Sequence, residues 1–150
     1  MAGTFVAIYC HVVFSTKHRQ PFIREDIRPR VHHYIGGIVR AQKSQNVVIG
    51  GTEDHVHILM GLNKQVGLSD AVAEIKANSS RWIHETFVDL REFAWQPGYG
   101  AYSVHPDGLE KTRRYIEGQE SHHREIGFEE EFRQLLDRLG IEYDPKLLWR

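Results

Sequence analysis

The first segment of the chain alternates apolar and other positions in the way a strand does. It runs from Thr4 to Thr16, is rich in β-branched and aromatic residues, and contains neither proline nor glycine. Five apolar side chains would share one of its faces at a spacing of two residues: Val6, Ile8, Cys10, Val12 and Phe14. The pattern predicts a central strand over this whole segment.

Two later segments repeat their apolar residues at every third or fourth position, which predicts amphipathic helices. The first covers about residues 25–42 and places Pro29 in its first turn, where a proline is tolerated. The second carries its apolar stripe over residues 68–87, with Ser69 as the expected N-cap.

The remaining segments predict three short strands and two more helices. Residues 46–51 and 55–62 flank a turn and predict a hairpin, and residues 101–104 predict a strand after a glycine-rich segment. A polar helix is expected over about residues 109–123. A last helix is expected over about residues 128–139, with three glutamates in its first turn and Gly140 after its end.

This order of elements is β-α-β-β-α-β followed by a helical tail. It predicts the α+β class and a ferredoxin-like plait, in which helices pack on one face of an antiparallel sheet and additional C-terminal helices follow. The other face of such a sheet is free to hold a ligand. The fold alone does not decide the function, because it carries many unrelated activities.

The length and the net charge of the chain limit the number of domains and the classes of protein to which it can belong. The 150 residues, at 17.4 kDa, fit one domain over residues 1–150. The net charge of -1 argues against a protein that coats nucleic acid by bulk charge alone. The charge is uneven, however: residues 1–50 carry seven Lys and Arg against two acidic residues, so a positive surface is expected from this part.

The cellular setting is inferred from what the sequence lacks. Cys10 is the single cysteine, so no internal disulfide can form. The chain opens without the pattern of a secretory leader, and no apolar run approaches the ~20 residues of a membrane helix. We therefore expect a cytoplasmic protein with no membrane partner.

The sharpest local motif is the pair His55 and His57 in DHVHILMGL. Alternate residues of a strand share a face, so the two imidazoles can converge on one cation while Val56 and Ile58 enter the core. An isolated pair of this kind is more often two satisfied surface histidines. A metal site also needs a third ligand from elsewhere in the chain.

The polar helix after Gly108 offers that ligand. Tyr115 and Gln119 are four residues apart on one helix face, and His122 continues the same stripe. The phenol could act as a nucleophile and the carboxamide oxygen as a neutral ligand. A tyrosine packed on Ile116 beside a solvated glutamine fits the spacing equally well.

Candidate DNA contacts surround this helix and the first turn of the chain. They are Lys17, Arg19, Lys111, Arg113, Arg114 and His122. Solvated helix faces, or for His122 a helix C-terminus, explain these residues as well. Four aromatic residues could stack on bases, although core packing is the commoner role and is favoured for Trp82; they are Trp82, Trp95, Tyr99 and Tyr102.

Together these residues resemble the single-tyrosine HUH transposases of single-strand insertion sequences, and their relatives associated with repetitive extragenic palindromes. The resemblance spans nearly the whole chain. It rests on the blocks HVVFSTKHRQPFI, IGGTEDHVHILMGL, IKANSSRWIHE, FAWQPGYGAYSV, YIEGQESHH and LLDRLGIEYDPKLLW, in this order.

The resemblance implies a complete reaction. His55, His57 and Gln119 would hold a divalent metal, Mg or Mn, and Tyr115 would attack a DNA phosphate to form a 5′-phosphotyrosine and release a 3′-hydroxyl. A later attack by such a hydroxyl would rejoin the strands. The family further implies single-stranded DNA that contains a hairpin, and a homodimer whose active sites are shared between subunits.

Two other functions stay open at this point. A domesticated, non-catalytic nucleic-acid-binding protein would have the same fold and would bind DNA without metal-dependent cleavage. A replication or mobilisation nuclease of the HUH type is less favoured, because the short chain leaves no room for a helicase domain.

Overall fold

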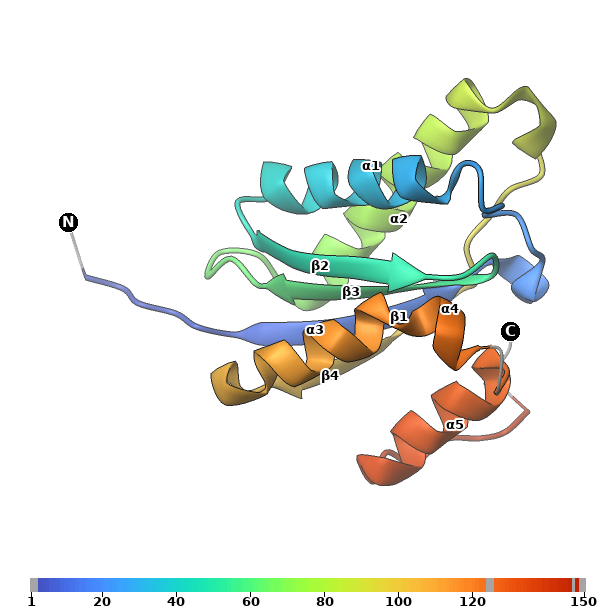
Figure 1. The fold of residues 1–150 in the computed structure, drawn as a ribbon. Helices are drawn as coiled ribbons and strands as arrows, with labels where there is room; N and C mark the ends of the chain where they lie inside the picture. The colour runs from blue at the N-terminus through green and yellow to red at the C-terminus, as the bar shows by residue number, and fades with distance from the viewer. Residues whose placement is uncertain (1–2, 124–125, 147, 149–150) are drawn as a thin grey trace.

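The computed structural model describes residues 3–123, 126–146 and 148. At its centre lies a four-stranded antiparallel sheet with the strand order β2-β3-β1-β4 (Figure 1). The strands are β1 (Tyr9–Ser15), β2 (Gln45–Gly51), β3 (His55–Gly61) and β4 (Gly100–Val104). The α+β plait expected from the order of elements is confirmed.

Helices cover both faces of this sheet, so the second face is not free, contrary to the expectation from the plait pattern: a C-terminal helix packs its apolar side there. Figure 1 shows α1 (Arg28–Ala41) and α2 (Leu68–Thr86) on one face, and the C-terminal helices on the other. These are α3 (Leu109–Glu117), α4 (Gln119–His122) and α5 (Phe128–Arg138). Three short 3-10 turns connect the elements: η1 (Lys17–Arg19), η2 (Val88–Leu90) and η3 (Pro106–Gly108).

The alternation along β3 divides the interior into two layers. Val56, Ile58 and Met60 are fully buried and belong to the larger core, under α1 and α2. His55 and His57 point to the opposite face, where α5 packs. A second, smaller hydrophobic core lies on that side of the sheet and consists of Val13, Tyr102, Phe128, Phe132, Leu135 and Leu136. One strand therefore supplies a hydrophobic core and a polar site at once.

The predicted first strand is too long at its start. β1 begins at Tyr9, and Phe5, Val6 and Ile8 are 94%, 44% and 52% exposed, so Val6 and Ile8 do not join the core face. The neighbouring strands end where Tyr9 pairs, with Gly61 on one side and Val104 on the other. Alternation alone cannot form a strand where the sheet offers no partner.

Helix boundaries differ from the sequence pattern at two places. Gly67, and not Ser69, is the N-cap of α2, and no side chain caps that end. The expected polar helix over residues 109–123 is interrupted at Gly118, which separates α3 from α4. Pro29 does lie in the first turn of α1, and Gly140 adopts the expected positive φ of 66° after α5.

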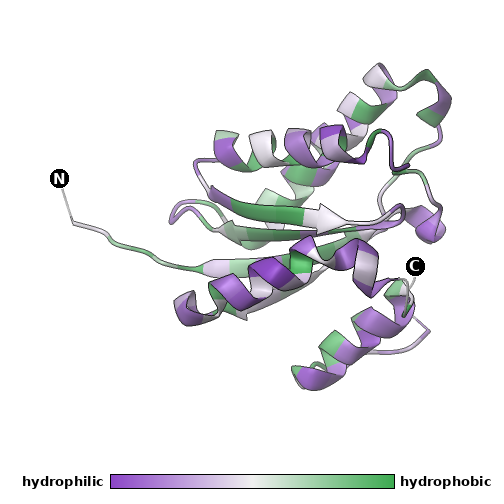
Figure 2. Cartoon of the chain, in the orientation of Figure 1, coloured by the Kyte–Doolittle hydropathy of each residue, from purple (hydrophilic) through white to green (hydrophobic). Residues whose placement is uncertain are grey.

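Hydrophilic residues dominate the outer surfaces of α3 and α5, and hydrophobic ones gather between the layers (Figure 2). None of the helices in the described parts of the chain is long and apolar enough to cross a membrane.

The close approach of α3 to the sheet depends on one glycine. A Cβ atom at Gly50 of β2 would lie 2.3 Å from the carbonyl oxygen of Ile116 and 2.8 Å from its Cγ2. Ile116 is fully buried at this contact. Only a residue without a side chain lets the helix that carries Tyr115 lie this close to β2.

We expect Gly50→Ala to destabilise the protein by about 1–3 kcal/mol, because the new methyl group overlaps a backbone atom. Urea denaturation measures this change. The control is Gly37→Ala in α1, where the nearest atom to a new Cβ is the end of Arg40 at 4.0 Å. This control should stabilise the helix slightly. A Gly50→Ala protein as stable as the wild type would contradict the close packing.

Candidate active site

β3 presents two fully buried imidazoles to the side of the sheet covered by the C-terminal helices. His55 and His57 both have 0% exposed surface, and their ring centroids lie 5.1 Å apart. They are therefore not the solvated surface pair that the motif alone allows. Their separation by one residue, Val56, places both rings on the same face of the strand.

Each imidazole is held at its Nδ1 atom, which turns Nε2 toward the space between the rings. His55 Nδ1 lies 2.8 Å from Asp54 Oδ1 and 3.0 Å from Thr52 Oγ1. His57 Nδ1 lies 2.7 Å from His11 Nε2 on the adjacent strand β1. These contacts fix the orientation of both rings, since each ring has one nitrogen in a hydrogen bond.

The residues predicted on the polar helix reach the same place. Gln119 is 1% exposed, and its Oε1 lies 3.0 Å from His55 Nε2. The ring of Tyr115 meets the ring of His57 edge-on, with centroids 5.8 Å apart. The interruption at Gly118 does not separate Tyr115 from Gln119, so the structure brings together the four residues that the sequence proposed.

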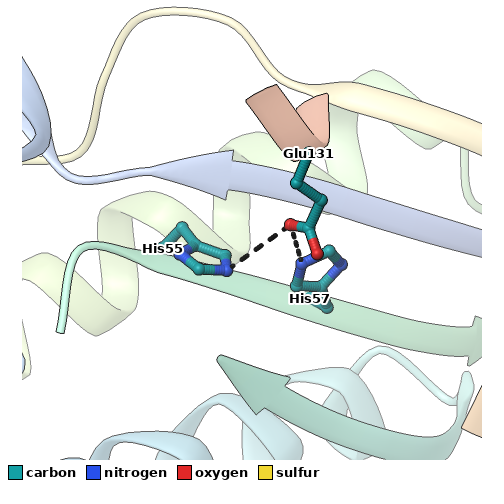
Figure 3. Close-up of side chains that lie close together, drawn as sticks. All are labelled: His55, His57 and Glu131. Atoms are coloured by element: carbon teal, nitrogen blue, oxygen red, sulfur yellow. Dashed lines mark hydrogen bonds and ion pairs between the residues drawn. The ribbon is translucent and has the colours of Figure 1, made fainter. Parts of the chain in front are cut away.

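A fifth residue lies between them, and the sequence analysis gave it no role in the site. Glu131 of α5 is 2% exposed and projects toward the two histidines (Figure 3). Its Oε1 lies 3.1 Å from His57 Nε2 and 3.7 Å from His55 Nε2. Its Oε2 accepts hydrogen bonds from the Tyr115 hydroxyl and, at 3.0 Å, from Gln119 Nε2.

Glu131 does lie in the first turn of α5, as expected. It is not, however, part of a solvated acidic face. Of the three glutamates in this turn, Glu130 is exposed, Glu129 is half-buried and Glu131 is buried. Helical periodicity places Glu131 one position before the buried Phe132, and nothing in that pattern indicates that the turn faces a cluster of histidines.

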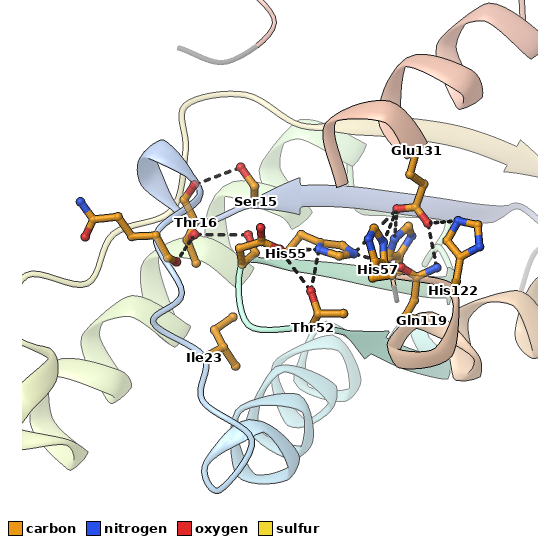
Figure 4. Close-up of polar contacts among 12 residues, drawn as sticks. Ser15, Thr16, Ile23, Thr52, His55, His57, Gln119, His122 and Glu131 are labelled. Carbon is orange, nitrogen blue, oxygen red and sulfur yellow. Dashed lines mark hydrogen bonds and ion pairs between the residues drawn. The ribbon is translucent and has the colours of Figure 1, made fainter. Parts of the chain in front are cut away.

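Two further histidines approach the same carboxylate. His122 Nε2 lies 3.3 Å from Glu131 Oε2, and His123 Nε2 lies 3.2 Å from Oε1. Figure 4 shows Gln119 and His122 reaching Glu131 from the same segment. His122, predicted as a DNA contact, therefore lies against the carboxylate at the centre of the site.

Burial and mutual contacts shift the proton affinities of these groups. Burial alone would raise the pKa of Glu131, but hydrogen bonds with His123 and His57 outweigh it and hold that pKa well below its usual range. Burial lowers the pKa of His57 to about 4, against the opposing hydrogen bond to Glu131. Burial, followed by the charge of Glu131, raises the pKa of Tyr115. The site therefore holds a charged carboxylate beside a protonated phenol.

The donor atoms suit a metal ion. His55, His57 and Glu131 each offer one ligand atom, and these three atoms lie within 4.8 Å of one another. Imidazole nitrogens and a carboxylate oxygen form a common ligand set for divalent cations. Gln119 Oε1, which faces the same imidazole nitrogen of His55, adds a neutral oxygen.

The remaining predicted DNA contacts lie on the surface and in two separate places. Figure 1 shows η1, with Lys17 and Arg19, and the start of α3 at opposite ends of the sheet. Arg19 pairs with Glu129 at 3.0 Å, Arg113 with Glu117 at 3.6 Å, and Arg114 with Glu110 at 3.5 Å, while Lys111 is exposed. The structure does not assemble these cations into one surface, and their binding role stays a prediction.

Most of the aromatic residues considered as base-stacking partners belong to the interior. Trp95 and Tyr102 are 8% and 7% exposed, and Trp82 stacks on Tyr34 with ring centroids 4.4 Å apart. Tyr99 is the exception, at 37% exposed. The core role favoured for Trp82 agrees with its packing against the main core.

Sequence comparisons identify the family of the chain. A sequence model of the family described as "Transposase IS200 like" matches residues 4–119. The ISDra2 transposase TnpA of Deinococcus radiodurans is 22% identical over 114 residues, which cover 73% of this chain and 81% of the relative.

Solved structures share the fold. A transposase from Deinococcus radiodurans superposes with a TM-score of 0.66 at 22% identity, over 79% of this chain and 95% of that one. A REP-associated tyrosine transposase bound to a REP hairpin gives a TM-score of 0.56 at 15% identity, over 77% of this chain and 68% of that one. The match to the family ends at Gln119, so α5 and Glu131 lie beyond it.

We expect Glu131→Ala to lower the free energy of unfolding by about 1–3 kcal/mol, because the buried Tyr115 hydroxyl and Gln119 amide lose their acceptor. Glu130→Ala, one position earlier and exposed, is the matched control and should change stability by less than about 0.5 kcal/mol. Chemical denaturation of the metal-free proteins compares them. Equal stabilities of the two variants would show that the contacts of Glu131 make no net contribution to the free energy of unfolding.

Proposed function

Because the chain belongs to the IS200-like transposases, we propose that it cleaves and rejoins single-stranded DNA through Tyr115. The observation that carries this proposal is the position of the Tyr115 phenol, which lies beside the buried rings of His57 and His11 and is hydrogen-bonded to a buried carboxylate. A tyrosine that served only to pack the helix would not need polar partners of this kind.

The reaction would be a transesterification. The Tyr115 oxygen attacks a DNA phosphate, a bond forms between them, and the 3′-oxygen of the preceding nucleotide leaves with a proton while the phenol loses one. The product is a 5′-phosphotyrosine and a free 3′-hydroxyl. Rejoining is the reverse attack by such a hydroxyl. The phosphotyrosine retains the energy of the broken phosphodiester, so no nucleotide cofactor is needed.

We propose that His55 and His57 bind a divalent cation, Mg or Mn, through Nε2, with Gln119 Oε1 as the third ligand. Glu131 Oε1 adds a negative oxygen at the same place, which offsets part of the charge of the cation. When bound, the cation would polarise a non-bridging phosphate oxygen and stabilise the charge that develops there.

The chain's own residues would orient the nucleophile. Glu131 Oε2 accepts the hydrogen bond of the Tyr115 hydroxyl, and the ring packs edge-on against His57 and His11. These contacts hold the phenol oxygen beside the ligand atoms, so a phosphate bound to them would lie within its reach.

The DNA partner proposed here is a single strand that contains a hairpin. One structural relative is described as bound to a REP hairpin, and the fold of this chain is similar to it. Recognition by shape and backbone would suit a domain of this size. We further propose action in the cytoplasm, which agrees with the free, buried thiol of Cys10.

We also propose a homodimer, on the resemblance to the family. The resemblance implies that each active site is shared between the two subunits. In this structure Tyr115 lies against His57 of its own chain. The arrangement described here therefore assembles these residues without a second subunit.

The nucleophile can be tested directly. Wild type should form a denaturant-resistant adduct with a hairpin-bearing single strand from the flanks of its own gene, in the presence of Mg or Mn. Tyr115→Phe should abolish the adduct and bind the DNA nearly as well. Tyr102→Phe is the control, because this buried hydroxyl has no hydrogen-bond partner among the described residues. An adduct formed by Tyr115→Phe excludes Tyr115, and binding without any wild-type adduct favours the non-catalytic alternative.

Metal binding tests the ligand set. We expect Glu131→Gln to weaken Mn2+ binding at least about tenfold, because a charged oxygen donor becomes neutral. Glu130→Gln should leave the affinity unchanged, and His57→Ala should weaken it further. Titration calorimetry measures each Kd. An unchanged or tighter Kd for Glu131→Gln would remove Glu131 from the ligand set.

A further inference from the structure

The two imidazoles of the site are anchored by different chemistry. His55 Nδ1 faces a carboxylate and a hydroxyl, from Asp54 and Thr52. His57 Nδ1 has neither of these, and its hydrogen-bond partner is the imidazole of His11, with 2.7 Å between His57 Nδ1 and His11 Nε2. His11 is 5% exposed, and in the proposed reaction its only role is to pack against the ring of Tyr115.

The strand register places His11 beside His57. In the antiparallel pair of β1 and β3, Val13 lies opposite His57, so His11 is its diagonal neighbour on the same face. The two ring centroids are 5.0 Å apart with an interplanar angle of 34°. The ring of His11 is also held edge-on by Tyr102 and by Tyr115, at 5.8 Å and 6.2 Å.

This hydrogen bond has a consequence for metal binding. A neutral imidazole carries one N–H, and Nε2 of His57 can bind a cation only when the proton is on Nδ1. His57 Nδ1 then donates to His11 Nε2. His11, as the acceptor, carries its own proton on Nδ1, and its Nε2 lone pair accepts the hydrogen bond from His57.

We propose that His11 is a positioning residue that fixes the tautomer and ring orientation of His57, so that His57 Nε2 is available to the metal. The inference rests on the metal site of the proposed function. It assigns to His11 the role that Asp54 and Thr52 have for His55. Outer-shell partners of this kind change metal affinity by about 10–100-fold when they are lost.

Three variants separate this role from simple packing. His11→Leu fills the space but offers no acceptor. His11→Gln keeps an acceptor oxygen that can reach His57 Nδ1. His84→Leu is the control, because it removes a histidine hydrogen bond of the same length, 2.7 Å from His84 Nε2 to the Phe93 carbonyl oxygen, away from the site.

Two measurements are made on the full chain. The first is the Kd for Mn2+, followed by the signal of free Mn2+ in electron paramagnetic resonance. We expect a 10–100-fold weaker Kd for His11→Leu, a Kd within about threefold of wild type for His11→Gln, and no change for His84→Leu. The second is the tautomer of His57 at a Mg2+ concentration that saturates the wild type, read from its ring 15N shifts. Without a cation, His57 Nε2 faces the Glu131 carboxylate at 3.1 Å and carries the proton itself. Wild type and His11→Gln should show the Nδ1–H form, and His11→Leu should lose it.

The outcomes distinguish this inference from the proposed function. A wild type that binds no Mn2+ contradicts both. A wild type that binds Mn2+ while His11→Leu binds it equally well overturns the role of His11 alone, as does the absence of an Nδ1–H on His57 in the Mg2+-bound wild type. An equal loss of affinity in His11→Leu and His11→Gln would also overturn it, because the acceptor would then not be what matters.

Discussion

The buried charge of the Glu131 carboxylate is the constraint on which the arrangement of this side of the molecule depends. A buried charge of this kind is tolerated only when hydrogen-bond donors and opposite charges surround it. Those donors come from several elements: His57 from β3, Tyr115 from α3 and Gln119 from α4. The hydrogen bonds that stabilise this one carboxylate therefore hold the candidate nucleophile and the candidate metal ligands close together.

Strand β3 connects this polar cluster to the stability of the whole fold. Its alternate residues bury Val56, Ile58 and Met60 under α1 and α2 and aim His55 and His57 at the other face. A shift of one residue in the register would turn the imidazoles into the hydrophobic core and the aliphatic side chains toward the site. The position of the histidines is therefore fixed by the same packing that stabilises the sheet.

The site combines residues inside the segment that matches the family with a residue outside that segment. The match to the family ends at Gln119 and so includes both histidines and Tyr115, whereas α5 follows after it. Helix α5 covers the sheet through its own apolar cluster and delivers Glu131 into the space between the histidines. The close contact of Gly50 with Ile116 lets α3 lie at the depth at which Tyr115 meets them.

Local spacing in the sequence was enough to predict the plait, the shared face of His55 and His57, and the shared face of Tyr115 and Gln119, because these follow from repeats of two and of about four residues. It was not enough for the start of β1, which depends on where the neighbouring strands end. Nor did it indicate Glu131 or His11. Their partners lie 74 and 46 residues away in the chain, and only tertiary packing decides which side chains meet across such separations.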